Sequence, residues 1–252
     1  NEKATGVTFC DSFNEHSKPM TILCDNVIAN CAIPVVPSML DEPYSSELQQ
    51  KISSKTNSCS LLCMYLGFNT DIEKFGVKYY SNVFEGHNVT ALKDIKTNHH
   101  GDWSNRRFIF VDYNKVDAGL TPPHKSEGVI CAVDYIEDWE NLNNEDYDLK
   151  KEEVAQVLLQ RLEKQYPGIR NSIEYYEVAT SKTIERYTSN PSGSVYGYAQ
   201  TKVQIENMRF RNHFLIPNLY VASAWAFPGG GFEGAIQGGF LAALQMKKDK
   251  IW

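Results

Sequence analysis

The residues most able to do chemistry in this chain form a glycine-rich turn near its C-terminal end. Pro228 is followed by three consecutive glycines, and residues 219–222 before it are a short apolar run typical of a strand. From Phe232 onward, apolar residues recur at helical spacing. A strand, a glycine turn and a helix start direct backbone N–H groups and a positive helix end at one place. That place suits an anion, a phosphate or a cofactor atom that becomes negative, although a purely structural turn explains the pattern equally well.

Three more glycines, Gly234, Gly238 and Gly239, fall inside the predicted helix. A glycine in a helix costs about 1 kcal/mol relative to alanine. We therefore expect a strand or a cofactor to pack closely against the backbone of this helix.

Length and composition restrict the class of protein. The chain has 252 residues, of which 42% are hydrophobic and 22% charged, as is ordinary for a globular protein. A net charge of -6 argues against nucleic acid as a partner. No apolar run reaches the roughly 18 residues of a membrane span. Residues 1–5 lack Met and resemble neither a signal peptide nor a natural start, so we expect a segment of a longer, cytoplasmic protein.

No metal site is predicted. The six cysteines form no CxxC pair, and they lie in apolar runs typical of strands, so we expect buried free thiols in a reducing compartment. His99 and His100 stand in a polar stretch with Asp102, where surface positions explain them better than metal ligation.

The N-terminal part is expected to contain strands at 5–10 and 20–30, after which Pro34 and Pro37 end regular structure. A short helix at 45–52, capped by Ser45, should follow.

The middle of the chain predicts an antiparallel sheet and one long helix. Strands are expected at 59–66, 76–84, 107–113 and 129–135, and the first of them reads as fully buried. An amphipathic helix is expected at 147–166, capped by Asp148, then a strand at 173–178 and a helical turn at 180–187.

These elements predict an α/β fold that is α+β in part. Both ends of the chain look like pieces of one cofactor domain, and the middle looks like a second domain inserted between them. The predicted segments are 1–34 and 199–252 for the cofactor domain and 35–198 for the substrate domain.

Several catalytic motifs are absent from the sequence. It contains no GxGxxG after an N-terminal strand, no GxSxG, no GxxxxGK[ST] and no HExxH. Acidic pairs such as Glu137-Asp138 are explained better by helix capping than by acid–base catalysis. No catalytic residue is therefore predicted.

Several stretches together resemble one family in the same order along the chain. They are DNVIAN (25–30), TPPHKSEG (121–128), KKEEVAQVLLQRLEKQYPGI (150–169), ATSKTIERYTSNPSGSVYGY (179–198) and IPNLYVASAWAFPGGGFEGAIQGG (216–239). They look like the C-terminal half of an FAD-dependent oxidoreductase of the phytoene desaturase, carotenoid isomerase and retinol saturase group. The last two stretches are the most specific.

The resemblance implies the C-terminal part of a two-domain flavoprotein with a Rossmann-type FAD domain and an antiparallel-sheet substrate domain. It implies FAD as cofactor and an apolar isoprenoid as substrate, reached by peripheral membrane contact if the substrate lies in lipid. The residues implied to contact FAD are Asn30, Trp225, Pro228, Gly230, Gly231, Phe232 and Glu233. Tyr187 and Tyr196 are implied to lie on the substrate side.

Two departures from the family pattern lead to further expectations. Ala222-Ser223-Ala224 stands where many flavoenzymes carry an acid that binds the ribityl hydroxyls. The N-terminal half with its GxGxxG is missing, so we expect this chain alone to retain no FAD and to be inactive. Two alternatives stay open: a lipid-binding chaperone of the GDP-dissociation-inhibitor type, and a subunit whose FAD-binding half is a separate chain.

Overall fold

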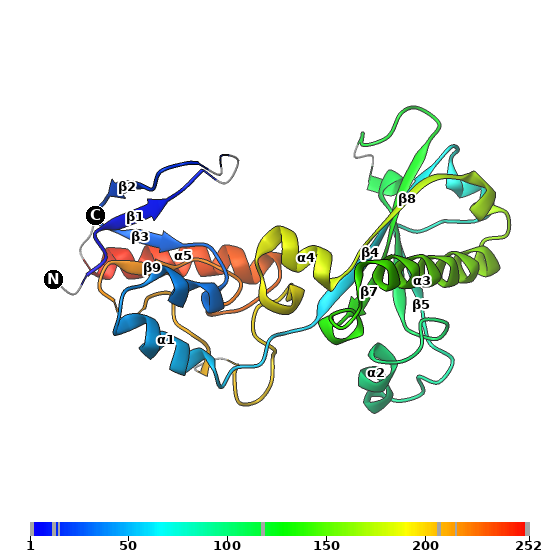
Figure 1. Cartoon of the computed structure of the whole chain (residues 1–252). Coiled ribbons are helices and arrows are strands. Elements are labelled where there is room, and N and C mark those ends of the chain that lie inside the picture. The colour runs from blue at the N-terminus through cyan, green and yellow to red at the C-terminus, as the bar shows by residue number, and fades with distance from the viewer. Residues whose placement is uncertain are drawn as a thin grey trace. The chain divides into compact units, whose positions relative to one another are not determined.

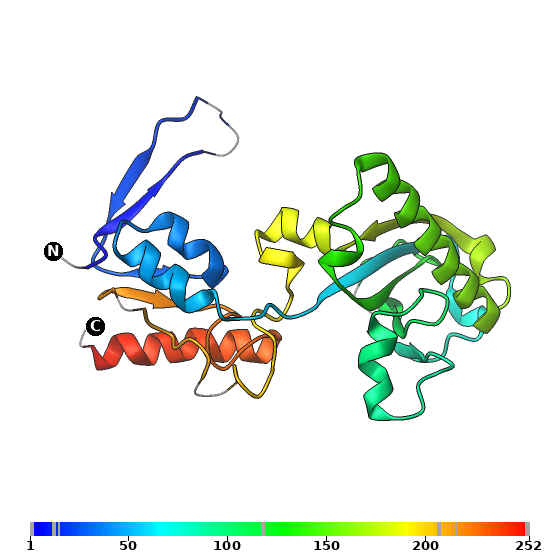
Figure 2. The same ribbon diagram turned by 60° about the horizontal axis from the view of Figure 1, so that its bottom comes forward.

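The computed structural model describes residues 3–11, 14, 16–116, 119–205, 208–214 and 216–249, and the chain divides into two compact units (Figures 1 and 2). The middle unit is Cys59–Thr188. The terminal unit is made of both chain ends, Asn1–Ser58 and Ser189–Trp252.

The middle unit is built on a five-stranded antiparallel sheet with the order β5-β6-β7-β4-β8. Its strands are β4 (Ser60–Phe68), β5 (Ser81–Phe84), β6 (Phe108–Asp112), β7 (Ser126–Asp134) and β8 (Ile173–Ala179). The predicted antiparallel sheet is thus confirmed, and the strand predicted at 173–178 joins it at one edge. Only the end of the predicted strand 76–84 pairs, because Gly76 has a left-handed backbone (φ 95°) and ends the 3-10 helix η2 (Ile72–Phe75).

One face of this sheet is the core of the middle unit. Alternate residues of β4, such as Met64 and Phe68, are fully buried against Leu158 and Leu162 of helix α3 (Asn144–Gln165). The predicted long helix is confirmed, but it begins earlier than expected. Its cap is Asn143, whose side chain accepts the N–H of Asp146 at 2.9 Å, so the prediction of Asp148 as the cap was wrong.

The opposite face of the sheet is largely apolar but half-buried or exposed, with carboxylates at Glu127 and Glu177, and we call it the open face. It was not expected, because β4 reads in the sequence as a strand buried on both sides. An antiparallel sheet needs only one covered face. The register places these open-face residues side by side: Leu61, Cys63, Tyr65, Val83, Ile109, Val111, Val129, Cys131 and Val133.

Short helices complete the middle unit. Helix α2 (Leu92–His99) was not predicted, since Asn98 is its one buried residue and it has no apolar stripe. Helix α4 (Ser181–Thr188) agrees with the predicted helical turn. The remaining 3-10 helices are η3 (Tyr113–Val116), η4 (Ile136–Asp138) and η5 (Ile169–Ser172).

The terminal unit contains two small sheets and helix α5 (Phe232–Lys248). Strands β1 (Gly6–Phe9) and β2 (Met20–Leu23) are antiparallel, whereas β3 (Val27–Ala29) and β9 (Leu219–Val221) are parallel. The strand predicted at 20–30 is therefore two strands. Pro34 and Pro37 lie within a 3-10 helix, η1 (Ile33–Met39), so the prediction that they end regular structure was wrong. Pro34 stands in the first turn, where a missing N–H costs nothing.

Helix α1 (Tyr44–Ile52) confirms the predicted helix, but its N-cap residue is Pro43 and the Glu42 carboxylate accepts the Ser46 N–H at 3.3 Å, so the Ser45 cap was wrong. Together η1 and α1 bury Val36, Leu48 and Ile52 in the same core as Val221 and Trp225. Residues 35–58 consequently belong to the terminal unit, and the compact units divide after Ser58 and Thr188 rather than at the predicted 34/35 and 198/199. The functional assignment of those segments stays a prediction.

The two segments of the terminal unit meet where the chain leaves it and returns to it. The hydroxyls of Ser58 and Ser194 are 2.7 Å apart, and the Ser58 N–H donates to the Gly197 carbonyl at 2.8 Å. A short 3-10 helix, η6 (Pro191–Gly193), precedes this contact.

The six cysteines are free thiols. Cys10 and Cys24 are exposed and the other four are half-buried, so the expectation that all are buried was wrong. Within the described ranges, no helix is long and apolar enough to cross a membrane.

Candidate functional site

The candidate site lies at the carboxyl ends of β3 and β9. In parallel sheets, ligands bind beyond the carboxyl ends of the strands. Asn30, the first residue after β3, donates its side-chain N–H to the carbonyl of Ala222, the first residue after β9. Asn30 therefore joins the two strands at the edge from which the glycine turn departs.

A buried amide fixes the turn between β9 and α5. The side chain of Asn212 donates to the carbonyl oxygens of Val221 (3.3 Å), Phe227 (3.0 Å) and Gly238 (3.1 Å). These acceptors belong to the strand, the turn and the helix, so a single side chain links all three. The sequence did not single out Asn212, because nothing local marks an asparagine as buried.

The glycines of the turn have different roles. A Cβ on Gly230 would lie 2.4 Å from the Tyr196 Cα, and a Cβ on Gly234 would lie 2.5 Å from the Gly229 carbonyl oxygen. These two glycines therefore let the chain pack against its own backbone. Gly231 differs: it has φ 86°, and apart from its chain neighbours the one atom of the described residues within 4 Å of its Cβ position is a Tyr196 ring carbon at 4.0 Å.

The start of α5 is open. No side chain caps it, Phe232 is 95% exposed, and Glu233 is exposed with its carboxylate accepting the Gln237 amide at 3.0 Å. The first N–H groups of a helix lack intrahelical acceptors, and the helix dipole adds positive potential there. Gly231 and Phe232 thus present a positive, accessible place for a negatively charged group.

Trp225 and Pro228 both precede the three glycines, in the segment between β9 and α5. Trp225 is only 2% exposed, donates its indole N–H to Asn190 at 3.2 Å, and packs edge-on to Tyr198. Pro228 is half-buried beside the glycines. Trp225 is therefore also a core residue of the terminal unit.

The two predicted substrate-side tyrosines fall in different units. Tyr196 is 42% exposed and its backbone lies against Gly230, so the structure brings it to the turn. Tyr187 is 76% exposed on α4 of the middle unit, where its hydroxyl accepts from Arg186 at 3.0 Å.

Ser223 stands where many flavoenzymes carry an acid, but its side chain is not exposed as that role would require. It is 7% exposed, and its hydroxyl accepts the N–H of Trp225 at 3.4 Å. Its side chain therefore stabilises the backbone at the beginning of the turn.

Arg209 is a buried cation that the sequence did not reveal. It is 4% exposed, and its guanidinium covers Gly229, where a Cβ would lie 2.9 Å from its Cζ. One nitrogen donates to the Tyr198 carbonyl at 3.1 Å, but Nε and Nη1 have no partner within the described residues. Burial lowers the pKa of this guanidinium. Arg209 stands in the alternating run Met208-Arg209-Phe210-Arg211, which does not say which arginine is buried.

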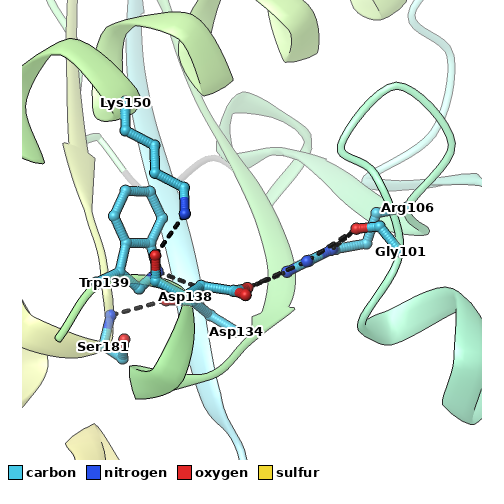
Figure 3. A network of polar contacts seen from close by, with 7 residues as sticks. All are labelled: Gly101, Arg106, Asp134, Asp138, Trp139, Lys150 and Ser181. Atoms are coloured by element: carbon cyan, nitrogen blue, oxygen red, sulfur yellow. Dashed lines mark hydrogen bonds and ion pairs between the residues drawn. The ribbon is translucent and has the colours of Figure 1, made fainter. Parts of the chain in front are cut away.

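A second polar cluster, in the middle unit, is structural (Figure 3). Asp134 is fully buried and accepts the Trp139 indole N–H at 2.9 Å and the Ser181 N–H at 2.8 Å. Burial raises the pKa of the Asp134 carboxyl, which these hydrogen bonds oppose. Its partners connect β7, η4 and the start of α4, and a carboxylate with no exposed surface cannot reach a substrate.

The same figure shows how the neighbouring loop is held. The Arg106 guanidinium lies between the Gly101 carbonyl (2.9 Å) and the Asp138 carboxylate (3.1 Å), and Lys150 donates to the Asp138 carbonyl. Arg106 also stacks on Trp103 at 3.9 Å. The cluster therefore fixes the loop before β6. No group of three or more His, Cys, Asp or Glu side chains in the described ranges could hold a metal ion.

The chain is similar to proteins of known families. Residues 6–246 match the family model described as "Flavin containing amine oxidoreductase". The chain is 35% identical over 155 residues to the chloroplastic prolycopene isomerase of Daucus carota, and 24% identical over 256 residues to the all-trans-retinol 13,14-reductase of Danio rerio. These alignments cover 59% and 94% of the chain but 25% and 41% of the relatives, so the chain spans less than half of their length.

Solved structures share the fold. An oxidoreductase from Methanosarcina mazei superposes with a TM-score of 0.55 at 14% identity, over 98% of this chain and 46% of that one. Cyclohexylamine oxidase from Brevibacterium oxydans gives a TM-score of 0.57 at 11% identity, over 99% and 47%. At these identities the likeness concerns the mixed α/β fold.

Proposed function

Because the chain belongs to the flavin-containing amine oxidoreductase family, we propose that it is part of an FAD-dependent oxidoreductase in which the start of α5 faces the flavin. The observation that carries this proposal is the open position at Gly231. No side chain caps the start of α5 there, and a Cβ on Gly231 would point into free space. When bound, FAD supplies the two-electron chemistry.

The residues at this edge fit such a cofactor. The N–H groups after Gly231 and the positive end of α5 would favour negative charge on the flavin ring. Arg209, buried against Gly229 with two nitrogens that have no partner among the described residues, adds a fixed positive charge to the same turn. Asn30 would hold the backbone of the adjoining strand end in place.

The rest of the flavin site would come from a flavin-binding half that packs on α5. An apolar stripe runs along this helix, with Ile236 74%, Phe240 64% and Leu244 39% exposed. Exposed apolar stripes of this kind mark interaction surfaces. A parallel sheet of two three-residue strands also lacks the neighbours such sheets normally have. Both features support a partner half on the terminal unit, either in the same polypeptide or as a separate chain.

The substrate we propose is an isoprenoid polyene whose C=C bonds are desaturated, saturated or isomerised. The named relatives act on prolycopene and retinol, and the open face of the middle unit offers the apolar surface that such a chain requires. Open-face residues such as Leu61, Ile109 and Val133 carry no charge, whereas the two carboxylates of this face in the described strands, Glu127 and Glu177, lie near the start of β7 and on the edge strand β8. Peripheral contact with a membrane is part of the same proposal, because polyenes partition into lipid.

Flavin retention tests the proposal. The chain should be purified alone and also as a longer protein joined to a flavin-binding half, whether that half is encoded in the same gene or by a separate chain, and bound flavin should be quantified by absorbance. We expect stoichiometric flavin in the longer protein and none in the chain alone by isothermal titration with FAD. Stoichiometric micromolar binding by the chain alone would contradict the need for a second half, and a longer protein without flavin would contradict the proposal itself.

Matched variants test the docking surface. Ile236→Asp and Phe240→Asp should abolish flavin retention in the longer protein while leaving the melting temperature of the chain alone unchanged, because both side chains are exposed there. Gln237→Asp, also exposed on α5, is the control that should retain flavin.

Lipid extracts of cells expressing the longer protein should show a changed polyene profile.

A further inference from the structure

Two cysteines face each other in the centre of the middle sheet. Cys63 of β4 and Cys131 of β7 are direct partners in the antiparallel register. Directly opposed residues in such a ladder have Cα atoms about 4.5 or 5.5 Å apart, and both separations lie within the range of about 4.4–6.8 Å found across disulfides. The strands thus place the two residues as a disulfide requires.

The two thiols already interact. Both side chains lie half-buried on the open face, opposite each other in the register. Their interaction lowers the pKa of the Cys131 thiol, whereas it raises the pKa of Cys63 together with burial. Thiolate is the reactive form of cysteine, so we expect Cys131 to attack first, and the single variants described below test this order.

We propose that Cys63 and Cys131 are a redox modification site that forms a reversible intramolecular disulfide with a low-molecular-weight disulfide such as oxidised glutathione. The proposal stands on the register and on the thiol–thiol contact, independently of any flavin chemistry.

The exchange proceeds in two balanced steps. The Cys131 thiolate attacks one sulfur of oxidised glutathione, and one glutathione leaves as a thiolate that takes up the proton lost by Cys131. Cys63 then loses its proton, and its sulfur attacks the Cys131 sulfur, which forms the protein disulfide and releases the second glutathione. Two protein thiols are oxidised, and one glutathione disulfide is reduced to two thiols.

The remaining cysteines have different surroundings. Cys10 and Cys24 follow the ends of β1 and β2, where the register pairs Phe9 with Met20 and Gly6 with Leu23, so they stand at opposite ends of that hairpin. Cys59 precedes β4, outside the paired stretch of the ladder. Cys63 and Cys131 are accordingly the pair of directly opposed cysteines in the described strands.

The test is peptide mapping of the purified chain. The protein is equilibrated with graded ratios of reduced to oxidised glutathione, alkylated under denaturing conditions and analysed by mass spectrometry. We expect a cross-linked peptide pair containing Cys63 and Cys131, two fewer alkylated thiols among the six, and full recovery after dithiothreitol. Alkylation or glutathione adducts at both positions at every ratio, or a cross-link to Cys59 instead, would overturn the proposal.

Variants resolve the order of attack. Cys63→Ser should trap a glutathione adduct on Cys131, whereas Cys131→Ser should leave Cys63 several-fold less modified. Cys59→Ser is the matched control and should keep the cross-link. Circular dichroism confirms that each variant is folded, and the wild-type map decides the proposal without them. Equal glutathione adduct on Cys63 and Cys131 in the two variants would refute Cys131 as the nucleophile.

Discussion

Replacing Gly230 by alanine should destabilise the terminal unit, because the added Cβ would lie 2.4 Å from the Tyr196 Cα and 2.5 Å from its carbonyl oxygen. Both atoms belong to the backbone, so no change of rotamer relieves the contact. Overpacking of this kind costs about 1–3 kcal/mol. Since 1 kcal/mol corresponds to about 2–4 °C in a chain of this size, we expect the melting temperature to fall by roughly 2–12 °C.

Gly239→Ala, in the helix that follows the turn, is the matched control. Apart from its chain neighbours and the nearby backbone of α5, no atom of the described residues lies within 4 Å of its Cβ position, so the substitution adds no tertiary contact. Alanine is about 1 kcal/mol more favourable than glycine within a helix, and the melting temperature should rise by roughly 2–4 °C.

Scanning calorimetry measures both effects, and because two compact units can unfold separately, each transition is fitted on its own. The transition of the middle unit should not move in either variant. If Gly230→Ala melts at or above the wild-type temperature, then the turn does not pack on Tyr196 and the assignment of Gly231 as the open position fails with it.

Further predictions concern the buried polar groups. Asn212→Ala should lower the free energy of unfolding by about 2–3 kcal/mol in urea titrations, since the hydrogen bonds that its amide donates to three carbonyls are lost. Arg106→Lys should lower the free energy of unfolding by about 1.5–3 kcal/mol, because lysine cannot contact the Gly101 carbonyl and the Asp138 carboxylate at once as the forked guanidinium does. Arg107→Lys, at the exposed ion pair with Glu85, is its control and should change this free energy by less than about 0.5 kcal/mol. Burial raises the pKa of Asp134, so the stability that this group contributes is fully present below the ordinary carboxyl pKa and is lost as the pH rises through the raised value. Asp134→Asn should therefore lose more stability relative to wild type at pH 3 than at pH 7, and an equal loss at both would refute the raised pKa.

The middle sheet could be predicted because its strands carry their pattern locally. In β6 and β7, every second residue is buried, and most of these residues in the middle of the strands are apolar, as Phe108, Phe110 and Ile130 illustrate. The open face could not be predicted, because the residues on it are apolar as well. Periodicity distinguishes an apolar face from a polar one, but it cannot tell which face is buried when both are apolar.

The candidate site was located by its glycines, but its supporting residues were not. Gly231 was found because three adjacent glycines are visible in the sequence. Arg209 and Asn212 lie in an irregular segment and become buried only when β9 and α5 pack around them. Their roles depend on tertiary contacts, which no local pattern records. Whether the predicted residues contact a flavin stays a prediction.

The hydroxyl contact between Ser58 and Ser194 has a consequence for the order of folding. These residues are 136 positions apart in the chain, and closing so long a flexible loop carries a large entropic penalty. A middle unit that has already folded replaces the flexible loop by a compact body. The terminal unit can moreover be completed only after synthesis has passed Ser189. We therefore expect the middle unit to fold first during translation, and the N-terminal segment 1–58 to wait for the C-terminal one.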